Sequence, residues 1–151
     1  MLKHILIATD GSKHSEKAAE KAIEVAKLSG GEVIALYVAD PRKYFAPAEE
    51  AMQASRSYEI PDDRIKMLQD SMLKEAEEAT KSAREAAKLA GVPLEKKIVK
   101  GHPADEILKA ANDVDLVVMG SLGRTGVSRY LLGSVTEKVI RNSKTPVMVV
   151  Y

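Results

Sequence analysis

The amino-acid sequence predicts an α/β fold in which a doubly wound, five-stranded parallel sheet carries helices on both faces. Short runs of Val, Ile and Leu recur along the 151 residues and alternate with longer segments whose apolar residues have helical spacing. The runs are almost continuously apolar, as in parallel strands that are buried on both faces. The length fits one hydrophobic core, so we expect residues 1–151 to form a single domain.

The N-terminal part of the chain predicts two strands joined by a helix. The first apolar run ends at Asp10-Gly11-Ser12, a combination typical of a turn followed by the start of a helix. Apolar residues then recur at helical spacing until Gly30-Gly31 stop the helix. The predicted elements are a strand over 4–9 (HILIAT), a helix over 13–28 and a strand over 32–38 (EVIALYV).

Residues 40–62 have little periodicity. This segment contains Pro41, Pro47 and Pro61, and prolines interrupt regular structure. We therefore predict a long loop there, with a helical turn at residues 49–54.

The C-terminal part predicts helices and strands in alternation. An amphipathic helix over 62–90, rich in alanine on its apolar face, ends at Gly91. Pro103 stands at a suitable first position for a short helix within residues 101–112. The other predicted elements are strands over 94–100, 115–120 and 144–151 and a helix that begins at Ser134.

Composition and charge exclude several classes of protein. Lys and Arg total 23 against 22 Asp and Glu, and the net charge of +1 gives no general electrostatic footprint for nucleic acid or an acidic membrane. The chain has no Cys, which excludes disulfides and thiolate chemistry, and its three histidines lack metal-ligand spacing. No apolar run approaches the roughly 20 residues that cross a bilayer, and no signal peptide is recognisable. We expect a cytoplasmic protein without nucleic-acid or membrane partners.

Glycines mark the end of the fourth predicted strand. Ligands of doubly wound sheets bind beyond the carboxyl ends of the strands, where the strand order reverses. Glycines there let backbone N–H groups approach phosphate oxygens closely. Downstream of Gly133, Ser134 is predicted to cap the next helix, with Glu137 at capping-box spacing, which brings the positive end of a helix dipole to the same place. Together with Arg124 and Arg129, these features predict a polyphosphate site.

The spacing of these glycines decides which phosphate-binding family the chain resembles. It has neither the Walker A pattern nor the dinucleotide pattern GxGxxG. The glycines instead follow the spacing G-x2-G-x9-G-S, with Gly120, Gly123 and Gly133-Ser134 at its fixed positions. This spacing is similar to the pattern of the ATP-binding universal stress proteins. The segments ILIATDGS, VIALYV, DLVVMGSLG, GSVTEKVI and TPVMVV extend the resemblance over nearly the whole chain. The resemblance implies a Rossmann-like fold of the adenine nucleotide alpha hydrolase type, with strand order 3-2-1-4-5.

The resemblance also implies a role for individual residues. Asp10 would lie near the ribose and phosphates of ATP or near a bound Mg or Mn ion, and Thr9 would help to line the pocket. The backbone of Val38 would read the adenine edge. Leu122 departs from the polar residue often found at its position. The residues implied to lie beside the nucleoside or the phosphates are Met119, Gly120, Gly123, Arg124, Gly133, Ser134, Val135 and Thr136.

Three functions remain open at this point. No Ser/His/Asp set, paired carboxylates or transfer-competent lysine is recognisable, which favours a binding protein over an enzyme. Together with this, the family resemblance implies an ATP-binding regulator or switch of the stress response. A slow Mg-dependent ATPase or phosphotransferase is the first alternative, and a nucleotide-free interaction module is the second. Asp10-Gly11-Ser12 also has a purely structural interpretation, as a turn and helix cap, and Arg124 and Arg129 can simply be solvated.

The last predicted strand bears on assembly. In the expected strand order it lies at an edge of the sheet, and an apolar edge is prone to pair with another strand. Pairing with the same strand of a second copy would satisfy both edges symmetrically. We therefore predict a homodimer through the C-terminal strand, and the resemblance implies the same.

Overall fold

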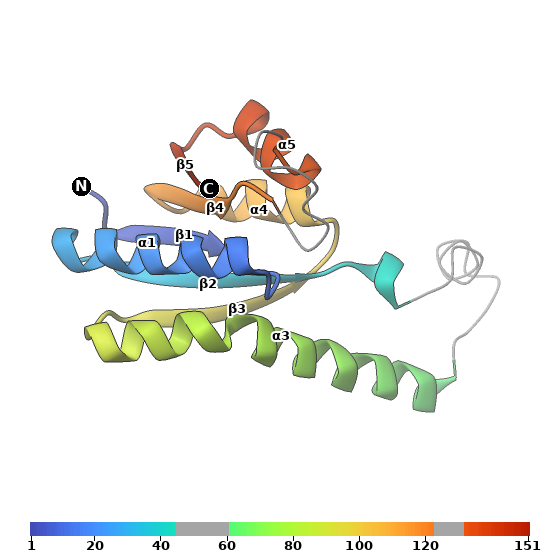
Figure 1. Ribbon diagram of the computed structural model, residues 1–151. Coiled ribbons are helices and arrows are strands. Elements are labelled where there is room, and N and C mark those ends of the chain that lie inside the picture. The colour runs from blue at the N-terminus through green and yellow to red at the C-terminus, as the bar shows by residue number, and fades with distance from the viewer. Residues whose placement is uncertain (45–60, 123–131) are drawn as a thin grey trace.

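The computed structural model describes residues 1–44, 61–122 and 132–151. Five strands form one sheet in the order β3-β2-β1-β4-β5, and every neighbouring pair is parallel (Figure 1). This confirms the predicted fold class and strand order. The strands are β1 (His4–Ala8), β2 (Glu32–Ala39), β3 (Leu94–Lys100), β4 (Leu116–Gly120) and β5 (Val147–Val150). The helices are α1 (Lys13–Ser29), the short 3-10 helix η1 (Pro41–Lys43), α3 (Asp62–Ala90), α4 (Pro103–Ala111) and α5 (Ser134–Asn142).

The helices cover the sheet from both sides, as Figure 1 shows. Because side chains alternate along a strand, Ile5 and Ile7 of β1 point into the core beneath α1 and α3, whereas Leu6 points into the core beneath α4 and α5. All three side chains are fully buried. Burial on both faces explains why the central strands β2, β1 and β4 are apolar almost without alternation.

The helix ends follow the glycines that predicted them. Gly30 and Gly91 adopt left-handed backbone conformations, with φ of 69° and 70°, as C-caps of α1 and α3. Their N–H groups donate to carbonyls of the last helical turn, those of Ala26 and Ala87. Both glycine predictions are confirmed, and the helix ends lie within a residue of the predicted positions.

The predicted loop over 40–62 is partly regular. Asp40 caps η1, and Pro41 occupies its first turn. The helical turn predicted at residues 49–54 lies outside the described residues. Among the described helices, none has both the length and the apolar composition needed to span a membrane.

Hydrogen bonds fix η1 to the neighbouring helix. The Tyr44 hydroxyl, directly after η1, donates to Glu75 Oε2 of α3 at 2.5 Å, and the Tyr37 hydroxyl donates to the same oxygen at 3.0 Å. Burial and the hydrogen bond to Glu75 raise the pKa of Tyr44 above its usual range, so the hydroxyl stays protonated as a donor. The residues around η1 therefore have a defined position beside the end of β2.

Candidate functional site

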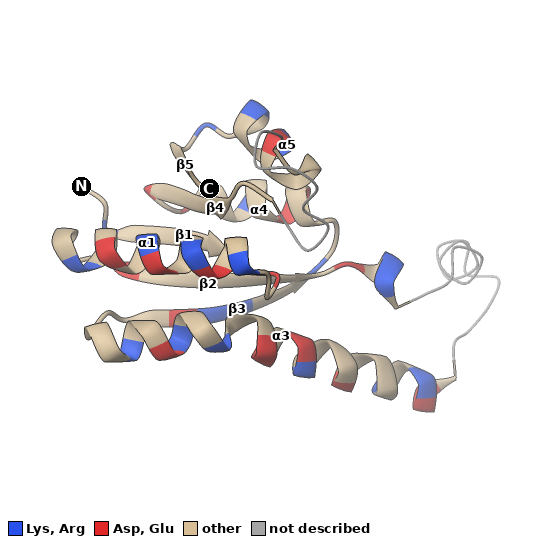
Figure 2. Ribbon diagram, in the orientation of Figure 1, with Lys and Arg blue, Asp and Glu red and all other residues tan. Residues whose placement is uncertain are grey.

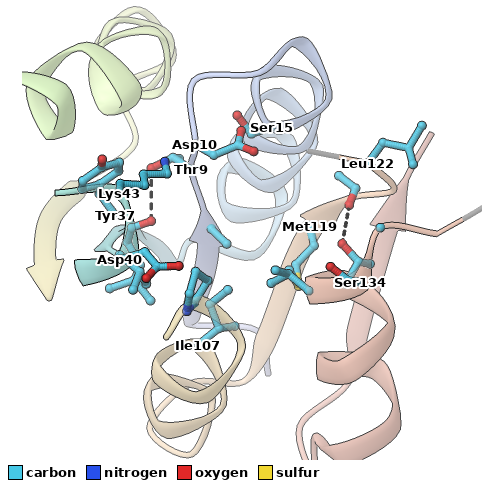
Figure 3. Close-up of a pocket in the computed structure, with 18 residues that line it drawn as sticks. Thr9, Asp10, Ser15, Tyr37, Asp40, Lys43, Ile107, Met119, Leu122 and Ser134 are labelled. Atoms are coloured by element: carbon cyan, nitrogen blue, oxygen red, sulfur yellow. Dashed lines mark hydrogen bonds between the residues drawn. The ribbon is translucent and has the colours of Figure 1, made fainter. Parts of the chain in front are cut away.

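A pocket of about 390 Å³ lies at the carboxyl ends of β1, β2 and β4. It is bounded by the turn after β1, by η1 after β2, by the first turns of α4 and by the N-terminus of α5 (Figure 3). In the sheet, β1 lies between β2 and β4. The chain adds β2 and β3 on one side of β1, and β4 and β5 on the other. The pocket therefore occupies the switch point of the sheet, where doubly wound folds bind their ligands.

The turn after β1 forms the middle of the pocket. Thr9 donates from its backbone N–H and its hydroxyl to the Leu36 carbonyl, at 2.9 and 3.1 Å, so its side chain holds the end of β1 against β2. The Asp10 carboxylate accepts from the Ser12 N–H at 2.9 Å, and Ser12 caps α1 by accepting from Ser15 N. The turn-and-cap interpretation of Asp10-Gly11-Ser12 thus describes the local structure, and Asp10 also lines the pocket.

At the opposite side of the pocket, the start of α5 differs from the predicted capping box. Gly133, in extended conformation, is the N-cap, Ser134 is the first helical residue, and no side chain caps the helix. Glu137 pairs instead with Arg141 at 2.9 Å. The predicted capping box of Ser134 and Glu137 is therefore wrong. A Ser134 cap would require the helix to begin at Val135, but it begins one residue earlier, at Ser134. Within the part of the chain that the structure describes, the N–H groups of the first turn of α5 consequently have no side-chain acceptor.

Two hydrogen bonds hold this helix start against β4. The Gly133 N–H donates to the Ser121 carbonyl at 2.7 Å, and the Thr136 hydroxyl donates to the Gly120 carbonyl at 2.9 Å. Thr136 is buried, with 4% of its surface exposed. The uncapped positive end of the α5 dipole is thereby fixed at the pocket wall.

Gly120 has a packing reason to be glycine. A Cβ atom at this position would lie 2.7 Å from the His14 carbonyl carbon and 2.8 Å from its Cβ atom. The end of β4 therefore packs directly against the first turn of α1. Access for a ligand is not needed to explain this glycine.

The structure brings most of the predicted site residues to one pocket. Gly123 and Arg124, with the nearby Arg129, lie outside the described residues. The predicted residues that line the pocket are Thr9, Asp10, Val38, Met119, Gly120, Gly133, Ser134, Val135 and Thr136.

Sequence reasoning identified Val38 at the β2 end of the pocket but missed Asp40 and Lys43, which follow this strand (Figure 3). Arg42 binds both Asp40 carboxylate oxygens, with Nη2 to Oδ2 at 2.6 Å and Nε 3.0 Å from each oxygen. These hydrogen bonds hold the pKa of Asp40 below its usual range, although burial acts in the opposite direction. Asp40-Pro41 has the N-cap and first-turn pattern of a helix start, a signal that could have revealed this part of the site.

The free backbone groups of Val38 add a donor and an acceptor. Even-numbered residues of β2 face β1, where the last backbone bond runs from Thr9 N to the Leu36 carbonyl. Odd-numbered residues face β3, as the bond from Gly101 N to the Ala39 carbonyl shows. Within the described residues, the Val38 N–H and C=O toward β1 therefore have no backbone partner and lie at the pocket.

The walls of the pocket differ from end to end. At the β2 and α4 end, Val38, Pro103 and Ile107 give an apolar slot beside Asp40. At the α5 end, backbone N–H groups and a helix dipole favour an anion. In the described part of the chain, no three His, Asp or Glu side chains are grouped to hold a metal ion.

Comparisons with known proteins agree with this geometry. A sequence model described as the Universal stress protein family matches residues 1–151. Universal stress protein MJ0531 of Methanocaldococcus jannaschii is similar, with 39% identity over 152 residues that cover 99% of this chain and 82% of that protein. The solved structure of MJ0577, 34% identical, has a TM-score of 0.78 over 99% of this chain and 96% of that one. A universal stress protein solved in complex with cAMP is 27% identical, with a TM-score of 0.67 over 99% and 97% of the two chains.

Proposed function

This chain belongs to the universal stress protein family, and we propose that it binds ATP in the pocket at the switch point and acts as a nucleotide-dependent regulator or switch in the stress response. One observation carries the proposal. The N-terminus of α5 is held at the pocket wall without a capping side chain, opposite an apolar slot at the end of β2. Such a pocket offers an anion site and a base site at its two ends.

Each part of the nucleotide has a suitable part of the pocket. The phosphates would lie at Gly133, Ser134 and the first turn of α5, where N–H groups and the dipole favour negative charge. The ribose would lie at the end of β1, beside Asp10. The base would occupy the slot at Val38, whose N–H and C=O have no backbone partner among the described residues and match the neighbouring acceptor and donor on the edge of adenine. A Mg or Mn ion would arrive with the phosphates and contact Asp10.

A relative solved in complex with cAMP supports an adenine nucleotide as the ligand, since the match covers 99% of this chain. The choice of ATP rests on the glycine spacing and on the length of the site, which extends from β2 across β1 to α5. Neighbouring strands lie about 4.8 Å apart, so the ends of β2 and β4 are roughly 10 Å apart. That span accommodates a base at one end and a phosphate chain at the other.

We propose binding rather than fast catalysis. Phosphoryl transfer needs positioned positive charge and a group that orients the nucleophile. Among the described pocket residues, Lys43 is the one cationic side chain, and it lies at the β2 end rather than beside α5 (Figure 3). A slow Mg-dependent ATPase remains the alternative. It predicts Mg-dependent phosphate release that an Asp10→Ala variant abolishes.

Calorimetric titration of nucleotide-free protein with Mg·ATP tests the proposal. The parent is compared with Gly133→Asn and Gly133→Asp, two side chains of the same shape that differ in charge. Both supply the cap that Gly133 lacks, so both keep or raise the free energy of unfolding by a few tenths of a kcal/mol. If phosphates lie at the helix start, the Asp variant loses roughly a hundred-fold more affinity than the Asn variant.

Each outcome of this titration has one meaning. Binding in the parent that the Asp variant loses and the Asn variant partly keeps supports the phosphate site. Equal losses in both variants would place the phosphates elsewhere. No binding of ATP to the parent would reject the proposal and favour the nucleotide-free interaction module.

We also propose that the protein forms a homodimer through β5. This strand lies at the edge of the sheet, and its residues Val147–Val150 carry no charge. The opposite edge, β3, carries Lys96, Lys97 and Lys100, as Figure 2 shows by colour along the strand. Lysines on an edge strand oppose pairing with another sheet. Of the two edges, β5 is therefore the one suited to a second copy.

A further inference from the structure

Asp40 is a buried carboxylate at the base end of the pocket. It follows β2, and its side chain is only 9% exposed. Val38 and Asp40 both line the pocket, while Ala39 between them is buried in the core and bonds toward β3. The Asp40 and Val38 side chains therefore lie on the same face of the sheet, and the Val38 carbonyl points in the plane of the sheet toward β1, at the same pocket.

The partner of Asp40 approaches from outside the pocket. The Arg42 side chain is 62% exposed and is not part of the pocket lining, whereas Asp40 is. With the guanidinium on its outer side, the carboxylate is held as an anion and acts only as a hydrogen-bond acceptor. It offers no donor to a ligand.

The carboxylate keeps acceptor capacity toward the pocket. Oδ1 accepts from the Arg42 backbone N–H and shares Nε, each at 3.0 Å, while Oδ2 accepts from Nη2 and shares the same Nε. Two carboxylate oxygens provide about four acceptor positions. The Nε–H of Arg42 is shared between the two oxygens, so the three N–H groups of Arg42 do not fill all four positions. Figure 3 shows the Asp40 carboxylate facing the space between β2 and Ile107 of α4.

We propose that Asp40 selects a 6-aminopurine, accepting one hydrogen of its exocyclic amino group while the Val38 carbonyl accepts the other. This inference rests on the proposed nucleotide function and names the specificity residue for its base. An amino group has two N–H donors, and these two acceptors border the same pocket at the end of β2, the carbonyl from the plane of the sheet and the carboxylate from its face. A 6-oxo purine would place an oxygen against the buried carboxylate, which has no proton to donate, so it would be rejected.

Titrations at pH 7.5 with the Mg complexes of ATP, ITP and N6-methyl-ATP test the inference. ITP replaces the amino group by an oxygen, and N6-methyl-ATP removes one of its two hydrogens. We expect the parent to prefer ATP over ITP by roughly a hundred-fold or more, with N6-methyl-ATP also weakened. In Asp40→Asn the side-chain amide can donate to the 6-oxo group, so the preference for ATP over ITP falls below about ten-fold.

A matched variant distinguishes the effect of the Asp40 carboxylate on base selection from the effect of its ion pair with Arg42. Arg42→Gln removes the partner of Asp40 and leaves the carboxylate in the pocket, so we expect it to keep the preference for ATP over ITP. Unfolding curves for both variants identify any loss of fold. A selectivity change in Asp40→Asn without one in Arg42→Gln supports the inference.

Three results would overturn it. The first is a parent that binds ATP and ITP equally, and the second is Asp40→Asn with unchanged selectivity; either leaves the nucleotide site intact and removes Asp40 as its base reader. The third is a parent that binds GTP more tightly than ATP, because the carboxylate would then accept from the N–H groups of guanine. A parent that binds no nucleotide rejects the proposed function together with this inference.

Discussion

Gly120 at the end of β4 lies directly against His14 in the first turn of α1, with no room for a Cβ atom between the two backbones. The carbonyl of the same glycine accepts the Thr136 hydroxyl from α5. One residue thus sets how closely a helix from each face of the sheet approaches the pocket. Packing and the geometry of the site are constrained together at this position.

Replacing Gly120 by Ala should destabilise the protein in the absence of any ligand. The added Cβ would lie 2.7 Å from the His14 backbone, which cannot move aside as the end of a side chain could. Forcing a methyl group into a packed contact typically costs about 1–3 kcal/mol. Urea unfolding of the ligand-free protein measures the loss. An unchanged unfolding midpoint would show that this contact has room for a methyl group.

Thr136→Val should weaken both the fold and nucleotide binding. The substitution keeps the shape of the side chain and removes the hydroxyl that donates to the Gly120 carbonyl at 2.9 Å. Loss of a buried hydrogen bond costs about 1 kcal/mol. If the same bond positions the start of α5, affinity for ATP falls by about five-fold.

Thr136→Ser is the control for this substitution. It keeps the hydroxyl and removes a methyl group, which costs about 0.8 kcal/mol of stability. Its affinity for ATP should equal that of the parent. Equal binding by the Val and Ser variants would mean that the hydroxyl has no positioning role.

Arg42→Gln should lower stability at neutral pH but not in acid. Hydrogen bonds from Arg42 are the main reason that the pKa of Asp40 is lowered in the folded protein. A lowered folded-state pKa stabilises the protein above the unfolded value of about 3.9, and the contribution is lost as the pH falls through the folded value.

The size and pH range of this effect follow from the geometry. Because Arg42 is 62% exposed, solvent screening limits the difference in unfolding free energy to about 1 kcal/mol. The difference in unfolding free energy should be fully present above about pH 5. It should disappear as the pH falls below about 4. Urea unfolding at several pH values measures it. A difference that persists undiminished at pH 3 would assign the effect to packing of the arginine stem.

The fold could be predicted from the sequence because several signals agreed. Continuous apolar runs indicated strands buried on both faces, and Gly30 and Gly91 marked helix ends whose left-handed conformation favours glycine. These signals are local, and tertiary packing preserved them. The strand order came from the family resemblance, since the residues alone did not fix it.

The site could be predicted only in part, because tertiary contacts decide its details. Gly133 and Ser134 are both acceptable N-caps, and the bond from Gly133 N to the Ser121 carbonyl selects the glycine. Asp40 and Lys43 lie in a segment without periodicity, and their place in the pocket depends on η1 being fixed to Glu75 of α3. Periodicity cannot reveal such residues.

The backbone of β5 shows which of its groups are free to pair. The Pro146 and Val150 carbonyls accept from Val117 N and Ser121 N, so the even-numbered residues of this segment face β4. Alternation then directs the N–H and C=O groups of Val147 and Val149 away from the sheet. These outward groups are the ones available to the same strand of a second copy.

Val149→Pro should therefore convert the proposed dimer to a monomer without unfolding it. Proline removes an outward N–H that would pair with the partner strand in the proposed dimer, and it leaves the bonds between β4 and β5 in place. Met148→Pro is the contrasting variant, because the Met148 N–H lies on the side that faces β4, and its loss should destabilise the sheet itself. Sedimentation equilibrium at tens of micromolar protein, with circular dichroism of each variant, separates the two effects. A monomeric parent, or a dimer that persists in Val149→Pro, would show that β5 is not the dimer interface, since an edge strand cannot keep its pairing when the central donor is missing.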